Sequence, residues 1–247
     1  MRRAPAEPGM RHDEASDRWS AASDGGLVTT TRFEGLPVEA FEFYDALAAD
    51  NTRAWWKRHK SDYEQAVRDP LTALLGELAA EFGDAHLFRP HRDTRFSKDK
   101  SPLKDHQGGF IGLEDAVGYY VQVSAAGLMV AGGWYAPQGH QVARYRDAVD
   151  SGHADHLRSL VTKLERQGWE IDGQPLKTRP RGVDADHPNL DLLRFRALIG
   201  LRTYAVEPWL GTRKTLTVVR NGWRQLRPLT EWLADHVGPA ADPALEP

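Results

Sequence analysis

The chain has 247 residues, a formal net charge of -3 and no cysteine. The missing thiols exclude a disulfide framework, a cysteine nucleophile and a cysteine-ligated zinc or iron–sulfur site. The near-neutral charge argues against bulk electrostatic binding of duplex DNA or of an anionic membrane. Hydrophobic residues at 40% and charged residues at 27% are close to globular averages, so the composition indicates a folded chain with a sizeable core.

The two ends of the sequence lack any periodic apolar pattern. Residues 1–30 are rich in Arg, Asp, Ser, Ala and Gly, and residues 238–247 include three prolines. We expect both to be disordered tails around a single α+β domain over residues 31–237, with Met10 as good a start as Met1. Since no apolar run resembles a signal-peptide core or the roughly 20 residues of a membrane span, we expect a cytoplasmic protein without a membrane partner.

The body of the chain begins with three helical segments. An apolar stripe after Pro37 predicts the first helix, and Asn51 or Thr52 can cap the second. Pro70 is expected to interrupt this second helix. A third stripe over Leu71–Phe82 is followed by a glycine that predicts its end.

The apolar period then changes to the alternation of strands. Residues His86–Ser97 alternate, and Phe110–Leu113 is flanked by glycines. Tyr119–Val123 and Leu128–Ala131 predict a hairpin in which Gly127 supplies the unusual backbone angle. Such short connections cannot cross over between parallel strands, so the sheet is expected to be antiparallel.

Helical spacing returns after this hairpin. Apolar residues recur over Gln138–Val149 and Leu157–Leu164, and again over Thr212–Val237, which Pro228 is expected to divide. Between these segments, Asp186 is the predicted N-cap of a further helix, and Leu198–Val206 is a predicted strand. The fold class is therefore α+β, with an antiparallel sheet of about four to six strands flanked by N-terminal and C-terminal helices.

The most highly charged segment runs from Arg89 to Lys104. If residues 91–97 are extended, Asp93 and Arg95 share a face, and a charge-assisted hydrogen bond from the carboxylate can orient the guanidinium. A guanidinium oriented in this way can donate two parallel hydrogen bonds to a phosphate or carboxylate group. We therefore expect this strand-loop to bind an anionic small molecule through Arg89, Arg92, Asp93, Arg95, Lys100 and Lys104.

Several alternatives stay open for this segment. If a reaction occurs, such as phosphoryl or glycosyl transfer, His91 and Asp99 are the general acid–base candidates by residue type. The segment can equally belong to a nucleic-acid or protein interaction module without catalysis, although the net charge does not favour nucleic acid. In a purely structural alternative, Asp93 and Asp99 hold the arginines in a buried ion-pair network or along a solvated sheet edge.

A second basic cluster contains Lys177 and Arg181 and precedes the helix predicted at Asp186. If it folds near the arginine segment, both can face one anion. Asp184, Asp186 and His187 contain metal-ligating atoms, but no second cluster at ligand spacing supports them, and we predict no metal site. The sequence names no cofactor and no oligomeric state.

The order Arg-x-x-Arg-Asp-x-Arg-Phe-x-x-Asp-Lys over residues 89–100 resembles the signature of a bacterial family known as domain of unknown function 2461. Where that family generally has a tyrosine, this chain has Leu103, so no role of a phenol carries over. The resemblance implies a bacterial intracellular protein and supplies no activity. The resemblance covers about residues 33–235. The further positions that match the family pattern are Phe33–Pro37, Asn51, Trp55, His59, Lys60, Tyr63, Gly132-Gly133, Lys177, Pro180-Arg181-Gly182 and His187-Pro188.

Overall fold

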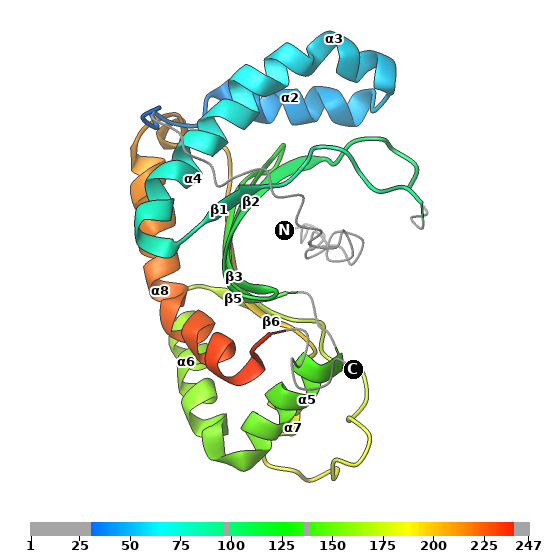
Figure 1. The fold of residues 1–247 in the computed structure, drawn as a ribbon, viewed down its shortest axis with the longest axis vertical. Coiled ribbons are helices and arrows are strands. Elements are labelled where there is room, and N and C mark those ends of the chain that lie inside the picture. The colour runs from blue at the N-terminus through cyan, green and yellow to red at the C-terminus, as the bar shows by residue number, and fades with distance from the viewer. Residues whose placement is uncertain (1–30, 96–98, 136–138, 240–247) are drawn as a thin grey trace, which may run out of the picture.

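The computed structural model describes residues 31–95, 99–135 and 139–239 (Figure 1). The tail predicted over residues 1–30 lies outside these ranges, and so do residues 240–247 of the C-terminal tail. Most buried apolar side chains of the described residues form one large cluster that extends from Phe33 to Val237, and Ala131, Ile199 and Leu201 form a second, small cluster.

One open sheet of six antiparallel strands forms the centre of the fold, in the order β1-β2-β3-β4-β6-β5. This arrangement confirms the α+β class and the predicted hairpin, whose strands β3 and β4 pair along their whole length. The strand β5 was not anticipated from the sequence. The strands are β1 (Ala85–Leu87), β2 (His106–Glu114), β3 (Val117–Ser124), β4 (Gly127–Trp134), β5 (Glu170–Asp172) and β6 (Leu198–Tyr204).

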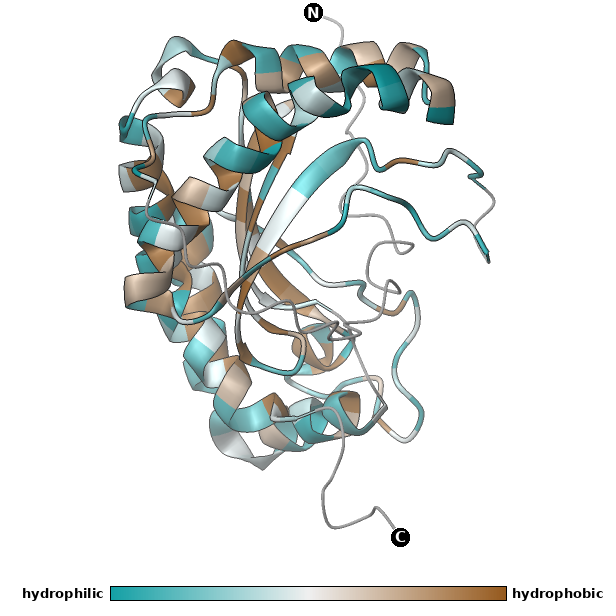
Figure 2. Cartoon of the chain, turned by 45° about the horizontal axis from the view of Figure 1, so that its top comes forward, coloured by the Kyte–Doolittle hydropathy of each residue, from teal (hydrophilic) through white to brown (hydrophobic). Residues whose placement is uncertain are grey.

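Helices cover one face of this sheet and both of its ends (Figure 1). The helices α4 (Asp69–Phe82), α6 (Ala154–Arg166) and α8 (Lys214–Val237) lie along the face, and α2 (Val38–Ala49) and α3 (Arg53–Tyr63) lie across one end. At the other end lie α5 (Gly139–Ala148) and the short α7 (Leu190–Leu193). Figure 2 shows the strands as largely hydrophobic and the arm beyond β1 and β2 as largely hydrophilic.

The core between the sheet and α8 depends on aromatic side chains and on glycines. Phe82, Tyr119 and Trp223 contact one another with ring centroids 5.0–5.4 Å apart, which joins α4, β3 and α8. A Cβ at Gly200 would lie 2.6 Å from Leu226 of α8, so the absence of a side chain lets the helix approach the sheet closely.

The interruption predicted at Pro70 is wrong, because the chain continues from α3 to α4 through a π-helical turn, η1 (Glu64–Arg68). The backbone N–H of Asp69 donates to the carbonyl of Glu64, five residues earlier. Pro70 then occupies the first turn of α4, directly after the π-helical turn.

The division predicted at Pro228 is also wrong, because α8 is a single helix of 24 residues. The proline lies on the exposed side, whereas Leu226, Leu229 and Leu233 are buried on the other side and hold both halves in the core. Figure 1 shows the helix bending in its C-terminal part, as expected where proline removes one backbone bond.

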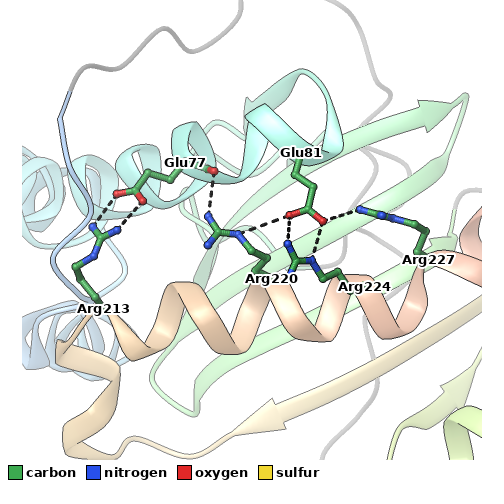
Figure 3. Close-up of polar contacts among 6 residues, drawn as sticks. All are labelled: Glu77, Glu81, Arg213, Arg220, Arg224 and Arg227. Atoms are coloured by element: carbon green, nitrogen blue, oxygen red, sulfur yellow. Dashed lines mark hydrogen bonds and ion pairs between the residues drawn. The ribbon is translucent and has the colours of Figure 1, made fainter.

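Two glutamates connect α4 to a row of arginines on α8 and directly before it (Figure 3). Glu77 forms a two-point ion pair with Arg213, with both N–O distances 2.8 Å. Glu81 contacts Arg220 at 3.8 Å, Arg224 at 2.8 Å and Arg227 at 2.9 Å, so one carboxylate serves three guanidiniums. These arginines hold the pKa values of both glutamates below the usual range.

Among the described residues, no helix combines the length and the apolar character needed to cross a bilayer.

Candidate functional site

The charged segment forms two facing arms that extend the β1–β2 hairpin beyond the sheet (Figure 1). The strand predicted over His86–Ser97 is wrong from Phe88 to Arg95, because the arms join there through isolated contacts and not through a regular ladder, and its last two residues lie outside the described ranges. Lys104 N donates to Pro90 O at 2.9 Å, and Arg92 N donates to Pro102 O at 3.0 Å. The two prolines have no N–H to return, which prevents continuous strand pairing here.

Side chains of the N-terminal helices fix this hairpin in place. The Asn51 side chain donates to Leu103 O at 3.0 Å and accepts from Leu103 N at 3.2 Å, so it pairs with the arm as a neighbouring strand would. The helix cap is therefore Thr52, whose hydroxyl accepts from Trp55 N. These contacts give Asn51 a structural role.

A buried hydrogen-bond network fixes the base of the same hairpin. The Tyr63 hydroxyl donates to Gln107 Oε1 at 2.6 Å. Gln107 Nε2 in turn donates to Phe88 O at 2.5 Å and to Gly108 O at 3.0 Å. Helix α3 therefore determines where the two arms leave the sheet.

The predicted pair of Asp93 and Arg95 is present. Arg95 Nε lies 3.0 Å from Asp93 Oδ1, and Nη2 lies 2.5 Å from Oδ2, so the carboxylate holds the guanidinium at two points. This contact holds the pKa of Asp93 well below its usual range. The Arg95 side chain is 77% exposed, and its Nη1 takes no part in the pair. The result is an oriented guanidinium at the surface.

Arg92 behaves differently, because it is enclosed between the two arms. Its side chain is 11% exposed, with Nη1 3.2 Å from Asp99 Oδ2 and Nη2 3.9 Å from Asp105 Oδ1. Its Nε is buried and finds no hydrogen-bond acceptor within the described ranges. A buried donor without a partner requires an explanation such as a water or a bound anion.

The structure adds two residues that the sequence analysis missed, Asp105 and His106. His106 is 6% exposed, and its Nδ1 lies 2.8 Å from Asp105 Oδ1. The hydrogen bond from His106 lowers the pKa of Asp105 to about 2, and Arg92 contributes in the same direction. The signal in the sequence was an adjacent Asp-His pair directly after Lys104.

The remaining predicted residues surround these contacts. Lys104 is 8% exposed, with its Nζ 5.5 Å from the Phe88 ring centre. Lys100 Nζ donates to Thr94 O at 2.7 Å, which joins the arms near their tip. Arg89 is exposed. The hairpin thus gathers Arg89, Arg92, Asp93, Arg95, Lys100 and Lys104.

The two acid–base candidates lie on opposite arms. His91 is exposed, and its ring lies edge-on to Trp56 at 5.6 Å. Asp99 accepts from Ser101 N at 2.9 Å, and the hydrogen bonds from Ser101 hold its pKa below the usual range. A carboxylate that stays ionised is poorly suited to donate a proton near neutral pH.

The second basic cluster does not join the hairpin. Lys177 and Arg181 follow β5 at one edge of the sheet, whereas the hairpin extends from β1 and β2 at the other. Five strand spacings separate the edges by about 24 Å along the sheet. Asp186 is not a helix cap, since α7 begins at Leu190 and has only four residues.

Metal-ligating side chains do not cluster in the described ranges, where no group of three or more His, Asp or Glu residues has a geometry for an ion. The ring of His187 lies 3.0 Å from Asp150, and its contact with Asp184 is a backbone hydrogen bond from His187 N to Asp184 O.

Comparison with known proteins gives one match. A family model described as conserved hypothetical protein (DUF2461) matches residues 39–232. No curated protein and no solved structure matches the chain.

Proposed function

The chain belongs to the DUF2461 family of conserved hypothetical proteins, and from this premise we propose that it binds an anionic small molecule, carrying phosphate or carboxylate, between the arms of the hairpin. Arg92 is the central contact, and Arg95 is an oriented contact at the surface. Lys104, Lys100 and Arg89 supply further positive charge to the same region.

The buried Nε of Arg92 is the observation that supports this proposal most directly. Leaving a charged group's donor unsatisfied in the interior costs more than about 1–3 kcal/mol. An oxygen of a bound anion removes that penalty, and a phosphate or carboxylate also suits the planar guanidinium. The Asp93–Arg95 pair supports the same conclusion, because a held guanidinium loses little further freedom when it binds.

A thermal-shift screen against phosphate- and carboxylate-bearing metabolites, with inorganic phosphate as the simplest probe, tests the proposal. A ligand at one hundred times its Kd adds about 2.7 kcal/mol to the free energy of unfolding. For a chain of this length, that corresponds to an increase of about 5–10 °C in Tm.

Three variants separate binding from folding. Arg95→Ala removes an exposed side chain and should abolish or reduce the shift while the unliganded Tm stays close to wild type. Arg92→Lys keeps the charge but removes the Nε donor, and it should also reduce the shift. Arg181→Ala removes an equal charge at the far edge of the sheet and should leave the shift unchanged.

The outcomes discriminate between a ligand-binding role and a structural role of these arginines. If Arg92→Lys and Arg95→Ala lower the unliganded Tm and leave any ligand shift intact, the arginines are structural and the proposal fails. A shift that Arg181→Ala also abolishes would contradict a binding site confined to the hairpin.

A further inference from the structure

The cationic hairpin is continuous with the face of the sheet that lies opposite to α4, α6 and α8 (Figure 1). On β3, Tyr119 contacts Trp223 of α8, and successive side chains of a strand alternate, so Tyr120 lies on the opposite face. The ring of Phe88 lies 6.2 Å from the ring of Tyr120, and Lys104 Nζ lies 5.5 Å from the Phe88 ring centre. A cation of the hairpin therefore lies directly beside aromatic rings of this face.

Four aromatic side chains form a row across this face. Phe88 neighbours Tyr120, Phe110 is the register partner of Tyr120 on β2, and the ring of Tyr135 lies 5.1 Å from that of Phe110. Phe110 is buried, whereas the other three are only partly buried. We call these four residues the aromatic row. It brings partly exposed rings next to positive charge, a combination that suits a planar ring that carries an anionic group.

Two glycines determine how the rings of the aromatic row lie. A Cβ at Gly108 would lie 2.7 Å from Cζ and Cε2 of Tyr120, and a Cβ at Gly118 would lie 2.6 Å from Cζ of Phe110. Each ring therefore lies over a glycine of the neighbouring strand, in space that a side chain would fill. Tyr120 is held against the sheet in this way, and one face of its ring is turned away from the strand.

Gln122 adds a polar group beside Tyr120 on the same face. The Tyr120 hydroxyl donates to Gln122 Oε1 at 2.8 Å, so the amide oxygen is used within the sheet. Nε2 carries two N–H donors, and no acceptor is assigned to it in the part of the chain that the structure describes. Gln122 can therefore donate to a carbonyl oxygen or a ring nitrogen of a planar group that lies on Tyr120.

We propose that the anion bound by the hairpin is the phosphate of a nucleoside phosphate, and that its base stacks on Tyr120. This inference rests on the proposed function and names its class of ligand. Arg92 and Lys104 contact the phosphate, and Gln122 Nε2 donates to an acceptor atom of the base. Only one sugar separates phosphate and base in such a ligand, so it can contact the hairpin and the adjoining rings at the same time.

Ribose 5-phosphate is the appropriate reference probe, because it keeps the sugar and the phosphate and lacks the base. Isothermal titration of the full chain at constant ionic strength should compare it with the monophosphates of adenosine, guanosine, cytidine and uridine. At least one of these four should bind with a Kd about tenfold or more below that of ribose 5-phosphate, as expected from the stacking of one base on an aromatic ring.

Two variants test the stacking contact. Tyr120→Leu keeps an apolar side chain but removes the ring, and it should reduce the preference for the nucleotide to about onefold while the Kd of ribose 5-phosphate stays unchanged. Tyr204→Leu is the matched control. Tyr204 is also partly buried, but it contacts Trp209 on the helix-covered side and should keep the wild-type preference.

A measurement on the wild-type protein covers the case in which Tyr120→Leu does not fold. In saturation-transfer NMR with the preferred nucleotide, the protons of the base should receive more saturation than those of the ribose, because the base lies against the aromatic row. Stronger saturation of the ribose than of the base would contradict stacking.

The possible results separate the two proposals. If inorganic phosphate, ribose 5-phosphate and all four nucleotides fail to bind, the anion site itself is refuted, and the nucleotide assignment falls with it. If ribose 5-phosphate binds with the same Kd as the nucleotides, or if Tyr120→Leu keeps the preference, only the nucleotide assignment is refuted.

Discussion

Replacement of Tyr63 by phenylalanine tests how the fold positions the hairpin. The change removes one hydroxyl that donates to Gln107 Oε1 at 2.6 Å, and both side chains are at most 3% exposed. Burial raises the pKa of Tyr63, so the phenol stays protonated and keeps donating at neutral pH. In Tyr63→Phe, the amide oxygen of Gln107 stays buried without its donor.

The expected loss follows from the cost of leaving a buried acceptor unsatisfied, which is about 1–3 kcal/mol. For a chain of this length, Tm falls by about 2–4 °C for each kcal/mol. Urea unfolding should show a lower midpoint with an unchanged m-value, because the substitution alters stability and not the surface exposed on unfolding. Hydrogen exchange should increase at Phe88 and Gly108, whose carbonyls Gln107 contacts.

A double-mutant cycle isolates the contact from other effects of the substitution. Gln107→Met removes the other partner, and the pair should show a coupling energy of about 1 kcal/mol. Tyr204→Phe is the matched control, since within the described residues no hydrogen bond is assigned to that hydroxyl. A loss below about 0.5 kcal/mol in Tyr63→Phe, or a coupling near zero, would refute the argument that this network positions the hairpin.

Three further predictions concern the packing of the sheet, the ion pairs between α4 and α8, and the stability of the protein at low pH. Gly118→Ala should destabilise the protein by more than about 2 kcal/mol in urea unfolding, since its Cβ would lie 2.2 Å from Ile111 O, whereas Gly139→Ala, with no atom within 4 Å, should change little. Glu81→Gln should remove about 1 kcal/mol, and a loss that persists unchanged in high salt would contradict an ionic origin. The folded-state pKa of Asp105 is lowered to about 2, so its contribution to stability is present above about pH 4 and is lost as the pH falls toward 2. Acid titration of Asp105→Asn should therefore show a smaller decrease over this interval, and an equal decrease would assign the effect to other carboxyls.

The sequence by itself determined the helices, the central hairpin and one local contact. Apolar periodicity depends on neighbouring residues, so the stripes ending at Phe82 and the alternation around Gly127 could be interpreted without knowing their partners. The contact of Asp93 with Arg95 was predictable for the same reason, because residues two apart on an extended segment share a face.

Tertiary structure decided the rest, because the relevant partners are distant in the chain or lie on the opposite arm. Packing of Leu226 and Leu229 on the sheet keeps α8 intact at Pro228, a contribution that local propensity does not contain. The separation of Lys177 from the hairpin follows from strand order. Only the folding of one arm onto the other brings Arg92 to Asp105, since the burial that strengthens this contact does not exist until both arms are in place.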